Sequence, residues 1–250
     1  MTRAPTGAGP LALVGGDELH PGNEPQDEVL VEAARDGPAF ILATAAARHD
    51  PRAAVRNAQA WFGGLGLRVE ELPAVRRSEV SSAINAERAR LGRFFYLLGG
   101  DPGRVPTTLN GTPVWTAIVE AWLGGAALAG SSAGAMALGG WNLIRDRRPG
   151  DAKRRYAPGL GLVPGVAVVP HFDTFGKDWV RGALLDPPRE DVILLGIDER
   201  SAAVWAARRW VALGPGAVTL FRDGGRRRYQ GGAQIDGLPA PSDRACENER

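Results

Sequence analysis

A serine flanked by glycines, in the segment Gly130-Ser131-Ser132-Ala133-Gly134, is the feature of this sequence best suited to covalent chemistry. The segment follows an apolar run typical of a strand and precedes small residues typical of a helix. A serine at such a sharp turn needs small residues two positions away on either side, because larger side chains would collide there. The pattern predicts a nucleophile elbow at Ser132, and a serine-rich loop with an N-cap serine is the alternative interpretation.

Backbone N–H groups near this serine could stabilise the negative charge that develops on a carbonyl oxygen under attack. The N–H of Ala133 would lie at the start of the predicted helix, facing the same space as the Ser132 hydroxyl. A second donor could be Gly99 or Gly100, in the glycine pair that ends the apolar run FFYLLGG. An ordinary turn at a strand end is the alternative for this pair.

The sequence contains three histidines, so a general base has few candidates. His171 ends the apolar run VAVVPHF, and doubly wound sheets keep their sites at the carboxyl ends of such strands. His20 and His49 fall in loops, where we expect surface roles. His171 is therefore the predicted base, with a structural histidine beneath a loop as the alternative.

Short apolar runs alternate with longer amphipathic segments, which is typical of a mostly parallel sheet with helices on both faces. The predicted strands are 11–16, 39–46, 67–73, 94–100, 126–131, 166–172 and 192–198, and the predicted helices are 26–35, 51–62, 78–90, 113–123, 133–138 and 177–185. After residue 198, GPG and DGG separate strand-like runs, which predicts an antiparallel extension at the sheet edge. We expect one α/β catalytic domain over 1–236 and a polar tail over 237–250.

Composition excludes several classes of protein. With 250 residues and 44% hydrophobic residues, the chain can bury a large core, so disorder does not describe the whole. The 30 basic and 28 acidic residues leave a net charge of only +2, so the composition does not indicate a nucleic-acid partner. No GxxxxGK[ST], GxGxxG or HExxH pattern occurs, so we expect no cofactor and no metal.

Cysteine usage and the apolar runs indicate a compartment. The single cysteine, Cys246, lies in the polar tail, which excludes an internal disulfide and fits a reducing environment. The apolar run near the N-terminus is too short for a signal peptide, and no run reaches the ~20 residues that a membrane helix needs. We therefore expect a cytoplasmic protein that does not bind membranes.

Four motifs occur in order along the chain: YLLGGD, GSSAGA, GLGLVPGVAVVPHF and GIDERSAAV. Together they resemble the motifs of the dipeptidase E and cyanophycinase family of serine peptidases, and the likeness extends from LALVGG to the hairpin ending near Asp223. The resemblance implies a three-layer α/β/α fold like that of class I glutamine amidotransferases, with serine in place of their cysteine.

The resemblance also implies roles for individual residues. The family's nucleophile falls on Ser132 and its histidine on His171, and its oxyanion donors fall on Ala133 and the GGD turn, where Gly100 is favoured. The family's carboxylate comes from the segment between the elbow helix and the histidine strand, which offers Asp146 and Asp151 here. The family's spacing favours Asp146, and the aspartate that is not used would then be a loop residue.

The expected substrate is a short peptide or an aspartyl-type amide, because that is what the resemblance implies. Cyanophycinases carry several arginines soon after the histidine, whereas this chain has Lys177 and only Arg181, so cyanophycin itself is disfavoured. Gly99, Asp101 and Arg155 are predicted to bind substrate, Arg155 because a guanidinium group pairs with carboxylates. A solvated basic loop around Arg155 is the alternative.

Other possibilities remain open at this level. Asp198 and Glu199 end a predicted strand, and could bind a substrate ammonium group or anchor the following hairpin. The same chemistry could act on a non-peptide amide or an ester, and a non-catalytic amidotransferase-like binding protein is a further alternative. The sequence leaves the oligomeric state open, and a homodimer is one alternative.

Overall fold

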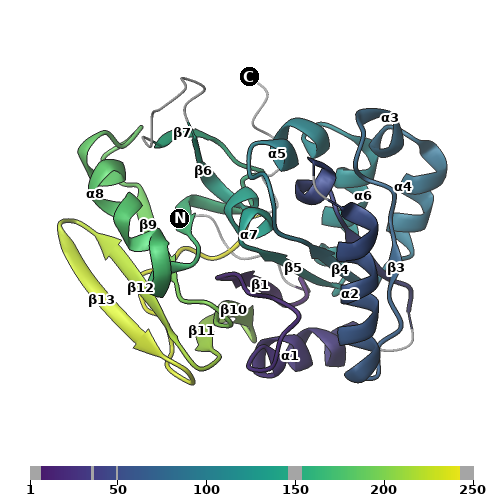
Figure 1. Ribbon diagram of the computed structural model, residues 1–250, viewed down its shortest axis with the longest axis horizontal. Coiled ribbons are helices and arrows are strands. Elements are labelled where there is room, and N and C mark those ends of the chain that lie inside the picture. The colour runs from purple at the N-terminus through teal and green to yellow at the C-terminus, as the bar shows by residue number, and fades with distance from the viewer. Residues whose placement is uncertain (1–6, 35–36, 49, 146–153, 243–250) are drawn as a thin grey trace.

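The computed structural model describes residues 7–34, 37–48, 50–145 and 154–242 (Figure 1). One group of strands comprises β1 (Leu11–Val14), β2 (Ala39–Leu42), β3 (Glu70–Glu71), β4 (Phe94–Leu97), β5 (Ala127–Ser131), β10 (Ala202–Ala206) and β11 (Arg209–Leu213). The other comprises β6 (Gly139–Arg145), β7 (Arg154–Pro158), β8 (Val163–Val169), β9 (Ile193–Ile197), β12 (Ala217–Arg222) and β13 (Gly225–Gln230). They form two sheets, ordered β11-β10-β1-β5-β4-β2-β3 and β13-β12-β9-β8-β6-β7.

Some of the helices begin at a capping residue followed by proline. The helices are α1 (Glu24–Ala34), α2 (Pro51–Gly64), α3 (Arg77–Val80), α4 (Ala83–Arg90), α5 (Arg104–Leu109), α6 (Pro113–Leu123), α7 (Ala133–Leu138) and α8 (Lys177–Leu185). Proline occupies the first turn of α2 and of α6, and the side chains of Asp50 and Thr112 accept N–H bonds there. In the described ranges, no helix combines the length and apolar character needed to cross a bilayer.

The core forms on both faces of the first sheet because side chains alternate along each strand. In β1, Leu11 and Leu13 join one apolar cluster, and Ala12 and Val14 join another. Helices α1 and α2 contribute to the second cluster, whereas α4, α6 and α7 contribute to the first. The second sheet packs into the first cluster, so the chain folds into layers with the first sheet between them (Figure 1).

Several local predictions need correction. The helix expected over 78–90 is two helices, because Ser82 caps a new start by accepting the N–H of Asn85. The DGG turn joins the hairpin strands β12 and β13, but GPG connects β11 to β12, which belong to different sheets. Strands β6 and β7 were not predicted, since β7 reads RRYAP and has no buried residue.

Contacts continue beyond the expected end of the domain at residue 236. The indole N–H of Trp210 donates to the carbonyl of Pro239 at 2.8 Å. The N–H of Ser242 donates to the carbonyl of Leu162 at 2.9 Å. Cys246 lies outside the described residues, and the division at residue 236 stays a prediction.

A buried carboxylate lies between α1 and α2. Asp27 accepts the indole N–H of Trp61 at 2.8 Å, and its second oxygen has no partner among the described residues. Burial raises the pKa of Asp27 to about 7; the bond from Trp61 opposes this, and the charges of Glu18 and Glu24 add to it.

Because this pKa is raised above the ordinary value of 3.8, Asp27 favours folding when protonated and opposes it when charged. Its contribution to stability is complete below the ordinary pKa and is lost as the pH rises toward about 7. We expect Asp27→Asn to remove a fall in unfolding free energy of up to about 1.4 kcal/mol per pH unit within this range. Urea unfolding at several pH values between 3.8 and about 7 measures this fall in unfolding free energy. Glu28→Gln, at an exposed position on the same helix, is the control. A wild-type slope in Asp27→Asn would contradict the assignment.

Candidate active site

The carboxyl end of β1 holds three segments that are far apart in sequence. The consecutive carbonyls of residues 14–16 accept N–H bonds from Ser132 at 3.0 Å, His171 at 2.6 Å and Arg200 at 2.9 Å. One short stretch of backbone therefore fixes the serine turn, the histidine and the loop after β9 relative to one another.

Ser132 adopts a strained conformation between β5 and α7. Its φ of 48° and ψ of −110° are rarely accessible to a residue with a side chain. A Cβ on Gly130 would lie 2.5 Å from the carbonyl carbon of Gly134, and a Cβ on Gly134 would lie 2.2 Å from the carbonyl oxygen of Leu97. Glycine at both positions is therefore required for the chain to pack this closely.

A hydrogen-bonded series links a hydroxyl, an imidazole and a carboxylate. The Ser132 Oγ lies 3.0 Å from His171 Nε2, and His171 Nδ1 lies 2.7 Å from Glu199 Oε1. A carboxylate can only accept, so the proton of a neutral imidazole must be on Nδ1. Nε2 is then free to accept a proton from the serine hydroxyl.

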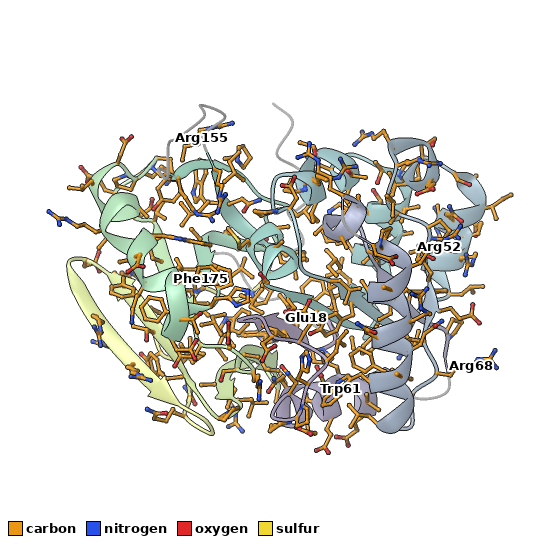
Figure 2. The ribbon with its side chains drawn as sticks, viewed as in Figure 1. Glu18, Arg52, Trp61, Arg68, Arg155 and Phe175 are labelled. Carbon is orange, nitrogen blue, oxygen red and sulfur yellow. The ribbon has the colours of Figure 1, made fainter. Side chains whose placement is uncertain are left out.

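Several groups hold the imidazole in this position. His171 has a φ of 51°, and its ring passes so close to Gly16 that a Cβ there would lie 2.3 Å from Cε1. The ring of Phe175 stacks on the imidazole with centroids 4.8 Å apart. Figure 2 labels Phe175, on the turn after β8, and Glu18, on the loop after β1. The backbone N–H of Glu199 donates to Asp173, which fixes the loop that carries the carboxylate.

The glycine turn after β4 has one N–H engaged and one available. Gly99 donates its N–H to Glu18 Oε1 at 2.9 Å, while Glu18 Oε2 accepts from the Ser131 hydroxyl at 2.8 Å. The N–H of Gly100 has no acceptor within the part of the chain that the structure describes. Ala133 is the first residue of α7, so its N–H has no acceptor within that helix. Of the two glycines considered for an oxyanion donor, Gly100 is thus the one with a free N–H.

Asp146 and Asp151, the carboxylates expected from the sequence, lie outside the described residues, so that expectation stays a prediction. The oxygen that lies 2.7 Å from His171 Nδ1 belongs to Glu199. Glu199 follows β9, which pairs in parallel with β8, so its loop and the histidine emerge at the same sheet edge. The family's spacing places the acid before the base in sequence, whereas the parallel pairing of β8 and β9 also allows a carboxylate that follows the base to reach it.

The other residues that the sequence suggested for the site lie in different parts of the structure. Asp198 is buried, accepts the N–H of Ala217 and pairs with Arg228 at 3.1 Å, so it anchors the hairpin. His20 is exposed and bonds the carbonyl of Glu18, and His49 lies outside the described residues. Asp101 and Arg155 line one pocket that also includes Gly100.

Two residues at this site were not identified as such from the sequence. Glu199 carried a usable signal, because it stands directly after a buried strand next to the histidine strand. Glu18 carried none, since it lies in an irregular loop in which Asp17 and Leu19 have positive φ angles. Only the folded chain brings that loop against β4 and β5 through its hydrogen bonds to Gly99 and Ser131.

Comparison with known proteins identifies relatives. Peptidase family S51 matches residues 11–206. A cyanophycinase of Trichormus variabilis (strain ATCC 29413 / PCC 7937) is 34% identical over 169 residues, which cover 64% of this chain and 55% of that protein. A cyanophycinase of Synechococcus elongatus is 33% identical over 140 residues, covering 53% of this chain and 43% of that protein. The chain thus spans about half the length of the curated relatives it matches.

Solved structures show the same fold. The crystal structure of a peptidase from an acI-B1 Actinobacterium matches with a TM-score of 0.79 and 30% identity, covering 91% of this chain and 96% of that one. A candidate peptidase E protein from Listeria monocytogenes EGD-e matches with a TM-score of 0.61 and 17% identity, covering 83% and 98% of the two chains. The expected α/β fold class is confirmed. Because the family match covers most of the chain, this protein belongs to peptidase family S51.

Proposed function

We propose that this protein is a serine hydrolase that cleaves an amide bond of a short peptide or an aspartyl-type linkage, using Ser132, His171 and Glu199. The observation that carries the proposal is the series of contacts from Ser132 Oγ to His171 Nε2 at 3.0 Å and from His171 Nδ1 to Glu199 at 2.7 Å. Hydroxyl, imidazole and carboxylate in this order are the parts of a serine-protease triad, which is recognised by geometry rather than by sequence order.

In the proposed reaction, the Ser132 oxygen attacks the substrate carbonyl carbon while His171 Nε2 takes the hydroxyl proton. The charge of Glu199 stabilises the imidazolium that forms. The N–H groups of Ala133 and Gly100 would donate to the oxyanion of the tetrahedral intermediate. When the C–N bond breaks, Nε2 returns the proton to the leaving amine and an acyl-serine remains. Water, deprotonated by the same imidazole, then hydrolyses this ester and restores the hydroxyl.

The choice of an amide substrate rests on the family, and the choice of a short or aspartyl-type peptide rests on the resemblance of the sequence motifs to the dipeptidase E and cyanophycinase family. A non-catalytic binding role would fit a site that lacks a carboxylate beside the histidine. Glu199 now supplies a carboxylate at hydrogen-bond distance from His171, which favours catalysis over a binding role.

Labelling with a fluorophosphonate probe tests the proposed nucleophile. We expect the wild-type protein to be labelled and Ser132→Ala to lose the label, since only an activated serine reacts with this probe. Ser81→Ala, which removes an exposed hydroxyl elsewhere, should be labelled like the wild type. A wild-type protein that resists labelling while folded would favour a binding protein instead.

Glu199→Gln tests the carboxylate. The amide oxygen can still accept from Nδ1, but the variant lacks the charge that stabilises the imidazolium, so we expect the labelling rate to fall by about 100-fold or more. Glu190→Gln, at an exposed position before β9, changes the charge by the same amount and should leave the labelling rate unchanged. Equal rates for Glu199→Gln and the wild type would assign the residue a purely structural role.

Gly16→Ala tests the positioning of the base. The added methyl group would overlap the imidazole of His171, so we expect at least about a tenfold loss of labelling rate with the fold retained. Gly22 has a φ of 107°, close to the 112° of Gly16. A Cβ on Gly22 would meet only side-chain atoms, those of Arg200 at 3.3 Å and of Pro215 at 3.6 Å. Gly22→Ala is therefore the control for backbone strain alone. Equal losses in both variants would show that strain, rather than displacement of the ring, is responsible.

A further inference from the structure

An aromatic ring is exposed beside the imidazole of the proposed triad. The ring of Phe175 stacks on that of His171, with centroids 4.8 Å apart and an angle of 21° between the planes. Phe175 is nevertheless 47% exposed, and no other aromatic residue is exposed in the part of the chain that the structure describes. A single exposed apolar residue needs no explanation by itself. This one, however, lies against a side chain that takes part in the proposed reaction.

The proposed reaction places a substrate residue close to Phe175. The amine that leaves when the C–N bond breaks receives its proton from His171 Nε2, so its nitrogen must come within ~2.6–3.2 Å of that atom. The side chain of the residue that carries this amine extends from the next atom of the peptide. Because Phe175 stacks on the same imidazole, this side chain can reach the exposed surface of the Phe175 ring.

Other side chains support the Phe175 ring from behind. The ring of Trp179, on α8, lies 5.5 Å from it between centroids, at an angle of 47°. Arg154 in turn covers Trp179, with its Cζ 3.4 Å from the ring centroid, and donates to the carbonyl of Leu143 at 3.1 Å. The Phe175 ring is therefore held between His171 and Trp179, and its exposed surface has a fixed place in the site.

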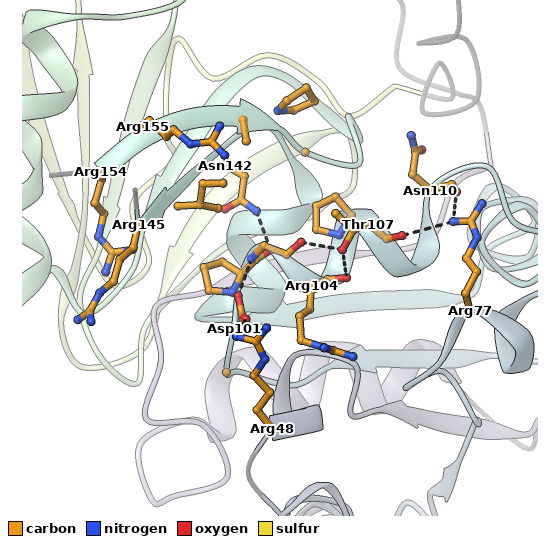
Figure 3. Close-up of a pocket in the computed structure, with 18 residues that line it drawn as sticks. Arg48, Arg77, Asp101, Arg104, Thr107, Asn110, Asn142, Arg145, Arg154 and Arg155 are labelled. Carbon is orange, nitrogen blue, oxygen red and sulfur yellow. Dashed lines mark hydrogen bonds and ion pairs between the residues drawn. The ribbon is translucent and has the colours of Figure 1, made fainter. Parts of the chain in front are cut away.

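This surface is separate from a second feature near the site, the arginine-lined pocket of about 1280 Å³ shown in Figure 3. Arg154 lines that pocket, but the described residues that line it include neither Phe175 nor His171. The properties of the surface beside the imidazole therefore depend on Phe175 and its own neighbours.

The charged neighbours of Phe175 disfavour an acidic side chain at this surface. Asp173 accepts the N–H of Glu199, and Glu199 accepts from His171 and from the hydroxyl of Thr174. These two carboxylates would repel a substrate carboxylate. Both already accept hydrogen bonds from the chain, so neither needs a substrate cation as a partner. An uncharged apolar side chain fits this surface best.

We propose that Phe175 is a specificity-determining residue that binds the side chain of the residue supplying the leaving amine, and that it selects large apolar or aromatic side chains there. This inference rests on the proposed function and adds the identity of the residue that follows the scissile bond. Covering the exposed ring removes apolar surface from water. A substrate ring would also gain from the offset or edge-to-face contacts that aromatic pairs prefer.

Phe175 also helps to hold the imidazole, and the two roles have different signatures. Displacement of the base slows the reaction of every substrate alike, whereas loss of a binding surface changes only the ratio between substrates that differ in that side chain. The experiment therefore measures a ratio within each variant.

Protection of Ser132 from a small fluorophosphonate probe tests the inference. Dipeptide amides with a free amino group represent the leaving fragment and compete with the probe for the space beside Nε2. We expect phenylalanyl-alanine amide to halve the labelling rate of the wild type at a concentration about tenfold below that needed for alanyl-alanine amide.

Variants at Phe175 assign this preference to its ring. Phe175→Ala should bring the two half-protecting concentrations within about twofold of each other, and Phe175→Leu, which retains apolar volume, should keep a preference of about threefold. Ile84→Ala removes an exposed apolar side chain on α4, which lies at the opposite end of Figure 1 from α8, and should keep the wild-type ratio. The ratios for Phe175→Leu and the wild type decide the matter if Phe175→Ala does not fold.

Three results would overturn the inference while labelling is normal: no difference between the two amides in the wild type, an unchanged ratio in both Phe175 variants, or stronger protection by arginyl-alanine or aspartyl-alanine amide. Absence of protection by every amide counts as the first of these. Each leaves the proposed chemistry standing. A folded wild type that the probe does not label overturns the proposed function, and this inference with it.

Discussion

The close approach of three loops to the carboxyl end of β1 is the constraint on which the rest of the site depends. The carbonyls of residues 14–16 receive the N–H groups of Ser132, His171 and Arg200. Two glycines make this possible: a Cβ on Gly15 would lie 2.1 Å from the carbonyl oxygen of Asp198, and a Cβ on Gly16 would overlap the imidazole. Because main-chain bonds set these positions, the side chains meet without long flexible connections, which is how a site becomes preorganised.

A second layer of polar contacts supports the turns on either side of the nucleophile. The two oxygens of Glu18 receive the Gly99 N–H and the Ser131 hydroxyl, so one carboxylate joins the turn after β4 to the end of β5. Both turns border the position where a substrate carbonyl would lie in the proposed reaction. A carboxylate with donors on both oxygens is satisfied in a partly buried place, where an unpaired one would be costly.

Carboxylates and arginines gather in different parts of the structure near the glycine turn. The carboxylates of Glu18, Asp173 and Glu199 gather around the serine and histidine loops, where each one accepts hydrogen bonds from the chain. The arginines gather on the other side of the glycine turn, where two of them have no partner among the described residues. In the first region, the charges hold the loops of the site in place, and in the second the arginines line a pocket.

The sequence by itself determined the α/β class, the family and the positions of the serine turn and the histidine strand. These rest on local patterns: apolar runs of strand length, and glycines two residues from a serine that must pass close to neighbouring backbone. The ends of the strands and the β6–β7 hairpin were harder to predict from the sequence. Strand β7 is polar and partly exposed, so its sequence has no periodic apolar pattern.

Only the tertiary structure decided which carboxylate meets His171 and which cations share a pocket. Glu199 lies 28 residues beyond the histidine, and the two meet because β8 and β9 are parallel neighbours whose carboxyl ends coincide. Arg48, Arg104 and Arg155 likewise come from separate elements and share one wall only after folding. Distances between residues far apart in sequence depend on strand order and packing, which no local pattern encodes, so a spacing rule could not show that Glu199 lies beside His171.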